Sequence, residues 1–302
     1  MRHLLILASV AIVCSAGMVQ AQTRELRPLS SETLDAVLTF LDVDASVPLD
    51  AHVVEVGEVL GFRRKKIVFT GGRGNRVPAY LSLPKVHGPA RLVLLQHAGA
   101  SSKESWWVPD GYEYGATLTR RLLENGFAVL ALDAQNHGEP SNSIDYVPIR
   151  TLYFTNHWWA AFRGMVLETA TDYRRALQYV ETRPELDLRR IGTVGQSMGG
   201  ITSVYLAAVE PRVGVVVAGA AALAEPWLYP LSPINLAPAL RRTQVLLIAA
   251  SKDSLIPRAN VDALTSALPT ENRQLRLLES DHRLPKDYVE LAVDWIAQGL
   301  QH

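Results

Sequence analysis

The sequence predicts an α/β fold with a mostly parallel, doubly wound sheet. Short apolar runs, each long enough for a buried strand, recur at Leu92–Leu95, Ala128–Leu132, Ile191–Val194, Val213–Val217, Val245–Ala249 and Leu275–Leu278. Amphipathic stretches lie between most of these runs, as crossover helices do in parallel sheets. The pattern Gly-x-Ser-x-Gly stands directly after one run and before an apolar stretch. We therefore expect strands buried on both faces, with helices between them.

Two elements precede this alternation. Ser30–Asp42 has leucine and valine at helical spacing behind a serine, which predicts a short capped helix. The strand-like runs Lys66–Thr70 and Val77–Leu83 are joined by a glycine-rich turn and predict an N-terminal hairpin. Those glycines are not followed by Gly-Lys-Ser/Thr, so a hairpin turn fits better than a phosphate-binding loop.

The stretch Gly195–Gly199, with Ser197 at its centre, predicts a sharp turn between a strand and the helix Ile201–Val209. Such a turn holds the serine in a strained backbone conformation and projects its Oγ above the sheet. Side chains two positions either way would collide with the neighbouring strand and helix, so glycine is needed there. We expect Ser197 to be a nucleophile.

A serine nucleophile needs a base, and the base needs an orienting carboxylate. Apart from the C-terminal residue, His282 is the only histidine after Ser197, and it lies in the loop after the last apolar run. Asp253 directly follows the preceding run, one loop earlier. Its rival Asp281 is adjacent to His282 in the sequence and cannot easily reach the ring. The pattern predicts the catalytic residues Ser197, Asp253 and His282.

The oxyanion of an acyl-transfer reaction is usually stabilised by two backbone N–H groups. One should come from Met198, the residue after the nucleophile, and the other from the loop 96–101 after the first buried strand. Small residues in that loop let the backbone approach the substrate oxygen. We predict Gly99 as the second donor, with Ala98 and Ala100 as alternatives.

Three further polar residues follow strands. His97 precedes the nucleophile and the acid in the chain, so we expect it to bond its own loop. Asp133 and His137 could be metal ligands, but no other carboxylate or histidine clusters with them at useful spacing. We expect loop-bracing hydrogen bonds, and neither a metal nor another cofactor.

Aromatic residues could line the substrate pocket. The irregular insert 139–159, rich in aromatic residues and prolines, could form a cap over it or a surface loop. The candidate substrate-binding residues, for which core or rim packing is the alternative, are Trp106, Trp107, Trp158, Trp159, Trp227 and Tyr229.

Composition and the first residues restrict the function. The formal net charge is +0, with 48% hydrophobic and 20% charged residues, which excludes a nucleic-acid binder. Met1–Ala21 has the pattern of a secretory signal: a short basic start, the apolar run Leu4–Val13 and small residues before the cleavage site. That run is shorter than the roughly 20 residues that span a membrane. We expect a secreted or periplasmic single domain over 22–302, with no membrane insertion after cleavage.

The single cysteine, Cys14, lies within the expected signal segment. Cleavage would leave a chain without cysteine, which excludes disulfides, thiol catalysis and cysteine-bound metal.

Several motifs resemble those of the α/β-hydrolase superfamily. Asp133–Ser141 is similar to its Asp-x-Arg-Gly-His-Gly-x-Ser turn, with Gln135 and Asn136 in place of arginine and glycine. His97–Gly99 resembles its His-Gly-x loop. Arg175–Glu185 is similar to dienelactone-hydrolase-like and acetyl-xylan-esterase-like members, and the hairpin resembles the start of prolyl-oligopeptidase-type domains. The resemblance implies the α/β-hydrolase fold over nearly the whole mature chain.

The resemblance also implies hydrolysis of esters, or less often amides. Dienelactone hydrolase uses a cysteine where this chain has Ser197, which argues against that particular activity. We expect a secreted serine hydrolase that cleaves small-molecule carboxylic esters through an acyl-enzyme. The alternatives are a peptidase or amidase related to prolyl oligopeptidase and a non-catalytic binding protein on this scaffold. The oligomeric state stays open.

Overall fold

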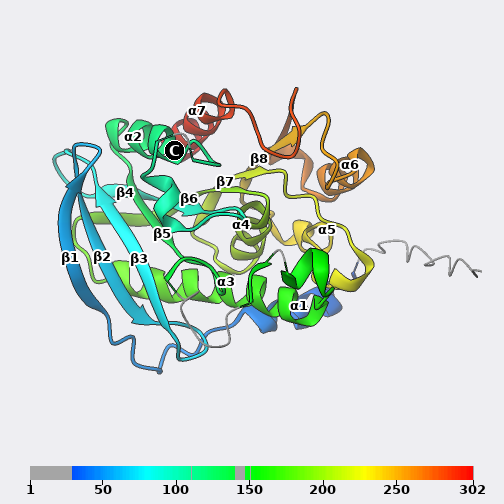
Figure 1. Cartoon of the computed structure of the whole chain (residues 1–302), viewed down its shortest axis with the longest axis horizontal. Coiled ribbons are helices and arrows are strands. Elements are labelled where there is room, and N and C mark those ends of the chain that lie inside the picture. Colours follow the sequence, from blue (N-terminus) through cyan, green and yellow to red (C-terminus); the bar gives the residue numbers. More distant parts are fainter. Residues whose placement is uncertain (1–28, 110, 140–146, 150, 302) are drawn as a thin grey trace, which may run out of the picture.

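A nine-stranded sheet runs through the molecule, in the order β1-β2-β3-β5-β4-β6-β7-β8-β9 (Figure 1). The computed structural model describes residues 29–109, 111–139, 147–149 and 151–301. The expected signal segment, with Cys14, lies outside the described residues. The strands are β1 (His52–Val59), β2 (Phe62–Thr70), β3 (Arg76–Leu83), β4 (Ala90–Gln96), β5 (Ala128–Leu132), β6 (Leu186–Gln196), β7 (Val213–Gly219), β8 (Gln244–Ala250) and β9 (Arg273–Leu278).

The strands from β4 to β9 are parallel to one another, whereas β1, β2 and β3 join the sheet in antiparallel fashion. The helices are α1 (Ser31–Leu38), α2 (Gly115–Glu124), α3 (Trp159–Val180), α4 (Met198–Val209), α5 (Pro233–Leu236), α6 (Arg258–Ala267) and α7 (Tyr288–Leu300). Short helical turns are η1 (Thr39–Leu41), η2 (Lys103–Trp106), η4 (Thr151–Thr155), η5 (Pro226–Leu228), η6 (Ala237–Ala239) and η7 (Thr270–Asn272).

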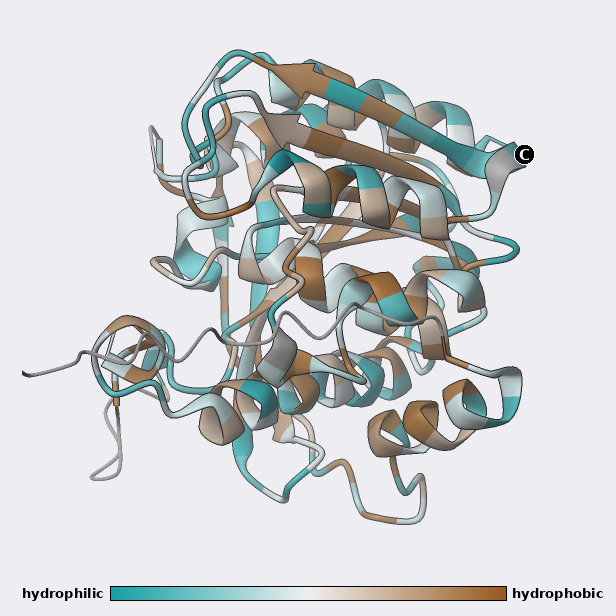
Figure 2. Cartoon of the chain, turned by 90° about the vertical axis from the view of Figure 1, so that its right-hand side faces the viewer, coloured by the Kyte–Doolittle hydropathy of each residue, from teal (hydrophilic) through white to brown (hydrophobic). Residues whose placement is uncertain are grey.

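Helices cover both faces of the sheet. Residues of α1, α3, α4, α5 and α6 pack in one hydrophobic cluster, and residues of α2 and α7 pack in a second cluster on the other face. Figure 2 shows largely hydrophobic strands between helices that carry both kinds of residue. Such two-faced burial explains why the parallel strands read as continuous apolar runs in the sequence.

The predicted fold class, the six apolar strands, the N-terminal hairpin and the serine-capped first helix are confirmed. One detail was wrong: β9 is an edge strand, and Leu277 is 47% exposed, so it is not buried on both faces. Strand β1 was not predicted. Most of its residues are exposed, so apolar and polar residues do not alternate along it as they would in a strand with one buried face.

The strand order changes direction around β4. After β5 the chain crosses to the other side of β4, so β4 and β6 become neighbours, with Gln96 paired to Gly195. Loops at the carboxyl ends of two such strands diverge and leave a crevice, which is where open α/β sheets bind ligands. The loop after Gln96 and the turn after Gln196 therefore meet at one place.

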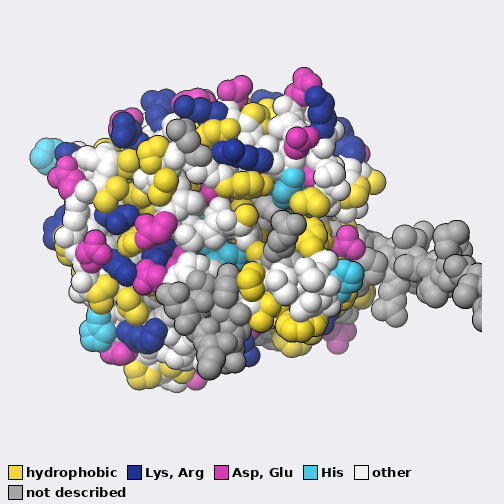
Figure 3. All heavy atoms as spheres, viewed as in Figure 1, with side chains coloured by type: hydrophobic (Ala, Val, Ile, Leu, Met, Phe, Trp, Pro, Cys, Tyr) yellow, Lys and Arg dark blue, Asp and Glu magenta, His cyan; other side chains and the backbone are white. Residues whose placement is uncertain are grey.

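Charged side chains of both signs share the surface. On the face seen in Figure 3, basic and acidic side chains are interspersed, in keeping with the formal net charge of +0. None of the helices in the described part of the chain is long and apolar enough to cross a membrane.

Candidate active site

Ser197 lies in the turn between β6 and α4. Its φ is 55° and its ψ is −118°, a strained conformation for a residue with a side chain. The backbone N–H of Ser197 donates to Gly219 O at 2.7 Å, which ties the turn to β7. The turn presents the hydroxyl at the carboxyl edge of the sheet.

The flanking glycines are required because backbone atoms pass close by. A Cβ on Gly195 would lie 2.1 Å from Gly199 O, and a Cβ on Gly199 would lie 1.9 Å from Gln96 O. Gly199 O belongs to α4 and Gln96 O to β4, so neither backbone atom can move without displacing that helix or a strand of the central sheet. The Gly-x-Ser-x-Gly pattern thus follows from the packing of β4, β6 and α4.

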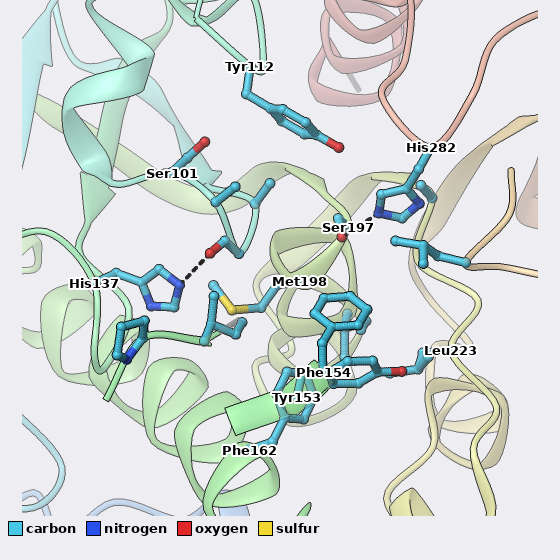
Figure 4. A pocket seen from close by; sticks show the side chains of 18 of the residues that line it. Ser101, Tyr112, His137, Tyr153, Phe154, Phe162, Ser197, Met198, Leu223 and His282 are labelled. Carbon is cyan, nitrogen blue, oxygen red and sulfur yellow. Dashed lines mark hydrogen bonds between the residues drawn. The ribbon is translucent and has the colours of Figure 1, made fainter. Parts of the chain in front are cut away.

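The structure brings the three predicted catalytic residues together. His282 Nε2 is 2.8 Å from Ser197 Oγ, and His282 Nδ1 is 2.8 Å from Asp253 Oδ2 (Figure 4 shows the serine and histidine). Asp253 follows β8 and His282 follows β9, and these strands are neighbours in the sheet. The rival, Asp281, is exposed.

The ionisation of Asp253 determines which ring nitrogen of His282 carries the proton. Burial opposes ionisation, but hydrogen bonds from His282 and from the N–H groups of Ile256 and Leu255 outweigh it and lower the pKa of Asp253. The ionised carboxylate only accepts hydrogen bonds, so His282 Nδ1 donates to it. In the neutral ring, Nε2 is then left to accept from the Ser197 hydroxyl.

The loop after β4 is held by a buried carboxylate. The N–H of Ala98 donates to Glu113 Oε1 at 2.9 Å, and Glu113 is 0% exposed. This occupies the N–H of Ala98, one of the three predicted second donors. Gly99 and Ala100 line the cavity beside Ser197, as Met198 does. A Cβ on Gly99 would lie 2.8 Å from Ile149 Cδ1, so glycine leaves room for the insert.

The two histidines near this loop are structural, as expected. His97 Nδ1 donates to Ala98 O at 2.8 Å, and its Nε2 accepts from the N–H of Ala134 at 3.0 Å. His137 Nε2 lies 2.9 Å from Gly99 O. Burial lowers the pKa of His97. Burial is also the main cause that lowers the pKa of His137 to about 4, and the nearby His97 adds to this shift. Both rings are therefore neutral near pH 7.

Asp133 braces the same region, again as expected. Its carboxylate accepts from Lys103 Nζ at 2.8 Å, from the N–H of Lys103 at 2.8 Å and from the N–H of Glu139 at 3.0 Å. Lys103 Nζ also donates to Glu139 Oε1 at 2.6 Å. The side chains of Lys103 and Asp133 are only 1% and 0% exposed, so the pair lies in the core.

A cavity of about 530 Å³ opens in front of Ser197. Its wall includes Tyr112, Ile149, Tyr153, Phe154, Phe162, Met198, Leu223 and His282 (Figure 4). Ile149, Tyr153 and Phe154 belong to the insert 139–159, which therefore contributes to the pocket. Residues 140–146 and 150 of the insert lie outside the described residues.

None of the six predicted substrate-binding aromatic residues lines this cavity. Trp106 and Trp107 are 0% and 4% exposed and pack in the cluster on the α2 and α7 face. Trp159 and Trp227 stack on each other behind the wall, with ring centroids 4.6 Å apart. Trp158 and Tyr229 are 50% and 37% exposed, outside the cavity. These six side chains therefore lie in the core, behind the wall or at the surface, whereas other aromatic residues line the cavity.

The sequence analysis missed Glu113, Tyr112 and the aromatic wall. Glu113 and Tyr112 stand in a loop with no motif, and their roles depend on contacts with distant segments. Tyr153 and Phe154 lie in the aromatic-rich insert, so its composition was the available signal. Within the described residues, no group of three or more His, Cys, Asp or Glu side chains could hold a metal ion.

The fold and the site together define an α/β protein of the hydrolase type. The family model described as "Alpha/beta hydrolase family" matches residues 86–298, so the chain belongs to this family. YtaP of Bacillus subtilis (strain 168), which bears a provisional hydrolase name, is 30% identical over 148 residues. That match covers 47% of this chain and 47% of YtaP, about half the length of each.

Solved structures resemble the fold at low sequence identity. Acetyl xylan esterase 1 from Thermoanaerobacterium sp. JW/SL YS485 has a TM-score of 0.66 and 19% identity, over 90% of this chain and 94% of that one. A cold-adapted esterase from an Arctic intertidal metagenomic library has a TM-score of 0.64 and 22% identity, over 82% and 97%. A glucuronoyl esterase from Solibacter usitatus has a TM-score of 0.63 and 14% identity, over 90% and 93%.

Proposed function

We propose that this protein is a serine hydrolase that cleaves carboxylic esters through an acyl-enzyme. The hydrogen-bonded chain from Asp253 through His282 to Ser197, beside a cavity of about 530 Å³, carries this proposal. The esterase names of several proteins with the same fold support an ester as the substrate.

In the first half of the reaction, Ser197 Oγ attacks the carbonyl carbon while His282 Nε2 takes its proton. The negative charge moves to the carbonyl oxygen, which accepts hydrogen bonds from the N–H groups of Met198 and Gly99. Asp253 stabilises the imidazolium without taking a proton. The tetrahedral intermediate then collapses, the C–O bond breaks, and the alcohol leaves with the proton from His282.

In the second half, His282 takes a proton from a water molecule that attacks the acyl group on Ser197. A second tetrahedral intermediate forms and collapses, the proton returns to Ser197 Oγ, and the carboxylic acid departs. The reaction consumes one water and regenerates the enzyme.

We also propose that the protein acts outside the cytoplasm. The pattern of a signal peptide in Met1–Ala21 supports a secreted or periplasmic location. The mass of the protein recovered from the medium or the periplasm tests this, because cleavage after Ala21 leaves Gln22 as the first residue. Retention of the full-length mass at that location would contradict cleavage.

The test of the activity is turnover of p-nitrophenyl acetate by the purified protein and by Ser197→Ala. We expect kcat to fall by at least about 10³-fold in the variant, because the nucleophile is lost while the fold is kept. A fluorophosphonate probe should add its mass to the wild type alone. Equal turnover by the two proteins would overturn the proposal.

A further inference from the structure

The cavity wall is apolar and uncharged. The side chains beyond the reacting groups include Tyr153, Phe154, Phe162, Met198, Ile201 and Leu223, and no described residue of the wall is Asp, Glu, Lys or Arg. An anionic substrate group would lose its hydration here without gaining a cationic partner, which is costly. The wall is therefore suited to an uncharged group.

The aromatic part of the wall is packed into a fixed shape. The ring of Tyr153 meets Phe154 and Phe162 edge-on, with centroids 4.7 and 5.1 Å apart. Phe162 and Tyr153 both contact Trp227 from the cavity side, at 5.5 and 5.8 Å between centroids. Trp227 is held in turn by stacking on Trp159. A wall ordered before binding loses little entropy when a ligand packs on it.

The position of His282 indicates which half of the ester contacts this wall. His282 must deliver a proton to the leaving alcohol, so the alcohol lies on the histidine side of Ser197. Figure 4 shows His282 on one side of Ser197 and Tyr153, Phe154 and Phe162 on another. The acyl group, which stays on the serine, is then the half that faces the aromatic wall.

We propose that the site selects uncharged esters whose acyl group is bulky and apolar, such as an arylacetyl group. This inference rests on the proposed function. An acetyl group would leave most of a cavity of about 530 Å³ unfilled. A larger apolar acyl group would cover the rings of Phe154 and Phe162. Even a single methylene group in an apolar pocket changes kcat/KM by about 10-fold to 200-fold.

The experiment compares p-nitrophenyl acetate, p-nitrophenyl phenylacetate and mono-p-nitrophenyl glutarate, which share one leaving group. We expect kcat/KM for the phenylacetate to exceed that for the acetate by about tenfold or more, and the anionic glutarate to be the poorest. Leu223→Trp, which fills the acyl side, should remove the preference, because it lowers kcat/KM for the phenylacetate more than kcat/KM for the acetate.

Phe40→Trp is the matched control, because it adds the same ring at a residue that is 68% exposed and is not part of the cavity wall. Phe154→Ala gives a second test that keeps the fold, since Phe154 is 55% exposed. In this variant the ratio of kcat/KM for the phenylacetate to kcat/KM for the acetate should fall several-fold. An unchanged preference in both variants, or a wild type that prefers the acetate or the glutarate, would overturn this inference alone. Failure of every ester to show Ser197-dependent turnover would overturn the proposed function as well.

Discussion

At the scale of single residues, Asp253 shows how one charge sets the proton positions of the site. Its Oδ1 accepts from the N–H groups of Leu255 and Ile256 at 2.8 and 2.9 Å, while Oδ2 faces His282. In Asp253→Asn the amide oxygen keeps the two backbone donors, so the NH₂ group turns to His282. Nδ1 must then accept, and the proton moves to Nε2, where it blocks proton transfer from Ser197.

We therefore expect Asp253→Asn to lower kcat by on the order of 10³–10⁴-fold with little change in thermal stability. The measurement is kcat on p-nitrophenyl acetate, with the melting temperature of each protein. Asp281→Asn, at the exposed acid beside His282, is the control and should keep kcat within about twofold. A large loss of kcat in Asp281→Asn with little loss in Asp253→Asn would instead identify Asp281 as the acid that orients His282.

At the scale of elements, the loop after β4 depends on a residue far from it in the sequence. Glu113 Oε1 accepts the N–H of Ala98, whereas Oε2 has no hydrogen-bond partner among the described residues. The Tyr288 hydroxyl donates to the backbone oxygen of Glu113, so the segment stays anchored when the side chain changes. The Glu113 side chain thus holds the position of the loop after β4, from which we propose that one oxyanion donor comes.

Glu113→Leu removes the acceptor for the N–H of Ala98, and Glu113→Gln keeps one. We expect kcat to fall by about tenfold to hundredfold in Glu113→Leu, with KM nearly unchanged, because a displaced donor weakens transition-state binding. Glu113→Gln should restore most of kcat. A purely structural role would show instead as a lower melting temperature in Glu113→Leu with an unchanged kcat of the folded fraction.

Sequence alone was sufficient for the parts of the site that follow local rules. Ser197, Asp253 and His282 were predictable because each follows a strand that is recognisable as an apolar run in the sequence, and the strand order makes those loops converge. Glu113 and the wall residue Phe162 were not, because their neighbours come from segments distant in sequence. The six aromatic candidates were also misplaced, because hydrophobicity alone does not say whether an aromatic side chain packs in a core, lies behind the cavity wall or stays exposed, as Trp158 and Tyr229 do.

At the scale of the whole molecule, Asp172 joins three distant segments. It lies on α3 and is 1% exposed, accepts from the N–H of Gly72 in the hairpin turn at 2.8 Å, and accepts from Gln135 Nε2 at 2.8 Å. Burial raises the pKa of Asp172 to about 6, and the nearby Glu168 adds to the shift, although hydrogen bonds from Gly72, Gln135 and Asn75 oppose it. The fold thus uses a carboxylate where its charge is costly.

This shift makes stability depend on pH in a defined direction. Between pH 3.8, the ordinary pKa, and about 6, the folded chain holds the proton that the unfolded chain has lost, so the free energy of unfolding falls as pH rises. Above pH 6 the cost is complete, roughly 3 kcal/mol at about 1.4 kcal/mol per pKa unit. In Asp172→Asn this cost is absent, and Gln135 can rotate its amide to accept from the new NH₂ group.

We therefore expect the melting temperature of Asp172→Asn, relative to wild type, to rise from pH 4 to about pH 6 and to level off towards pH 7. Thermal unfolding of both proteins at pH 4, 5, 6 and 7 gives the comparison, with Asp35→Asn, at an exposed position of α1, as the control for general pH effects. A difference that stays constant over this range would mean that burial and the hydrogen bonds cancel, and would contradict the raised pKa. A difference that falls would mean that the buried carboxylate is stabilised in its charged form. In that case the hydrogen bonds from Gly72 and Gln135 would outweigh the effect of burial on the pKa of Asp172. Asp253 in the active site is an example of this balance, because its own hydrogen bonds outweigh burial and lower its pKa.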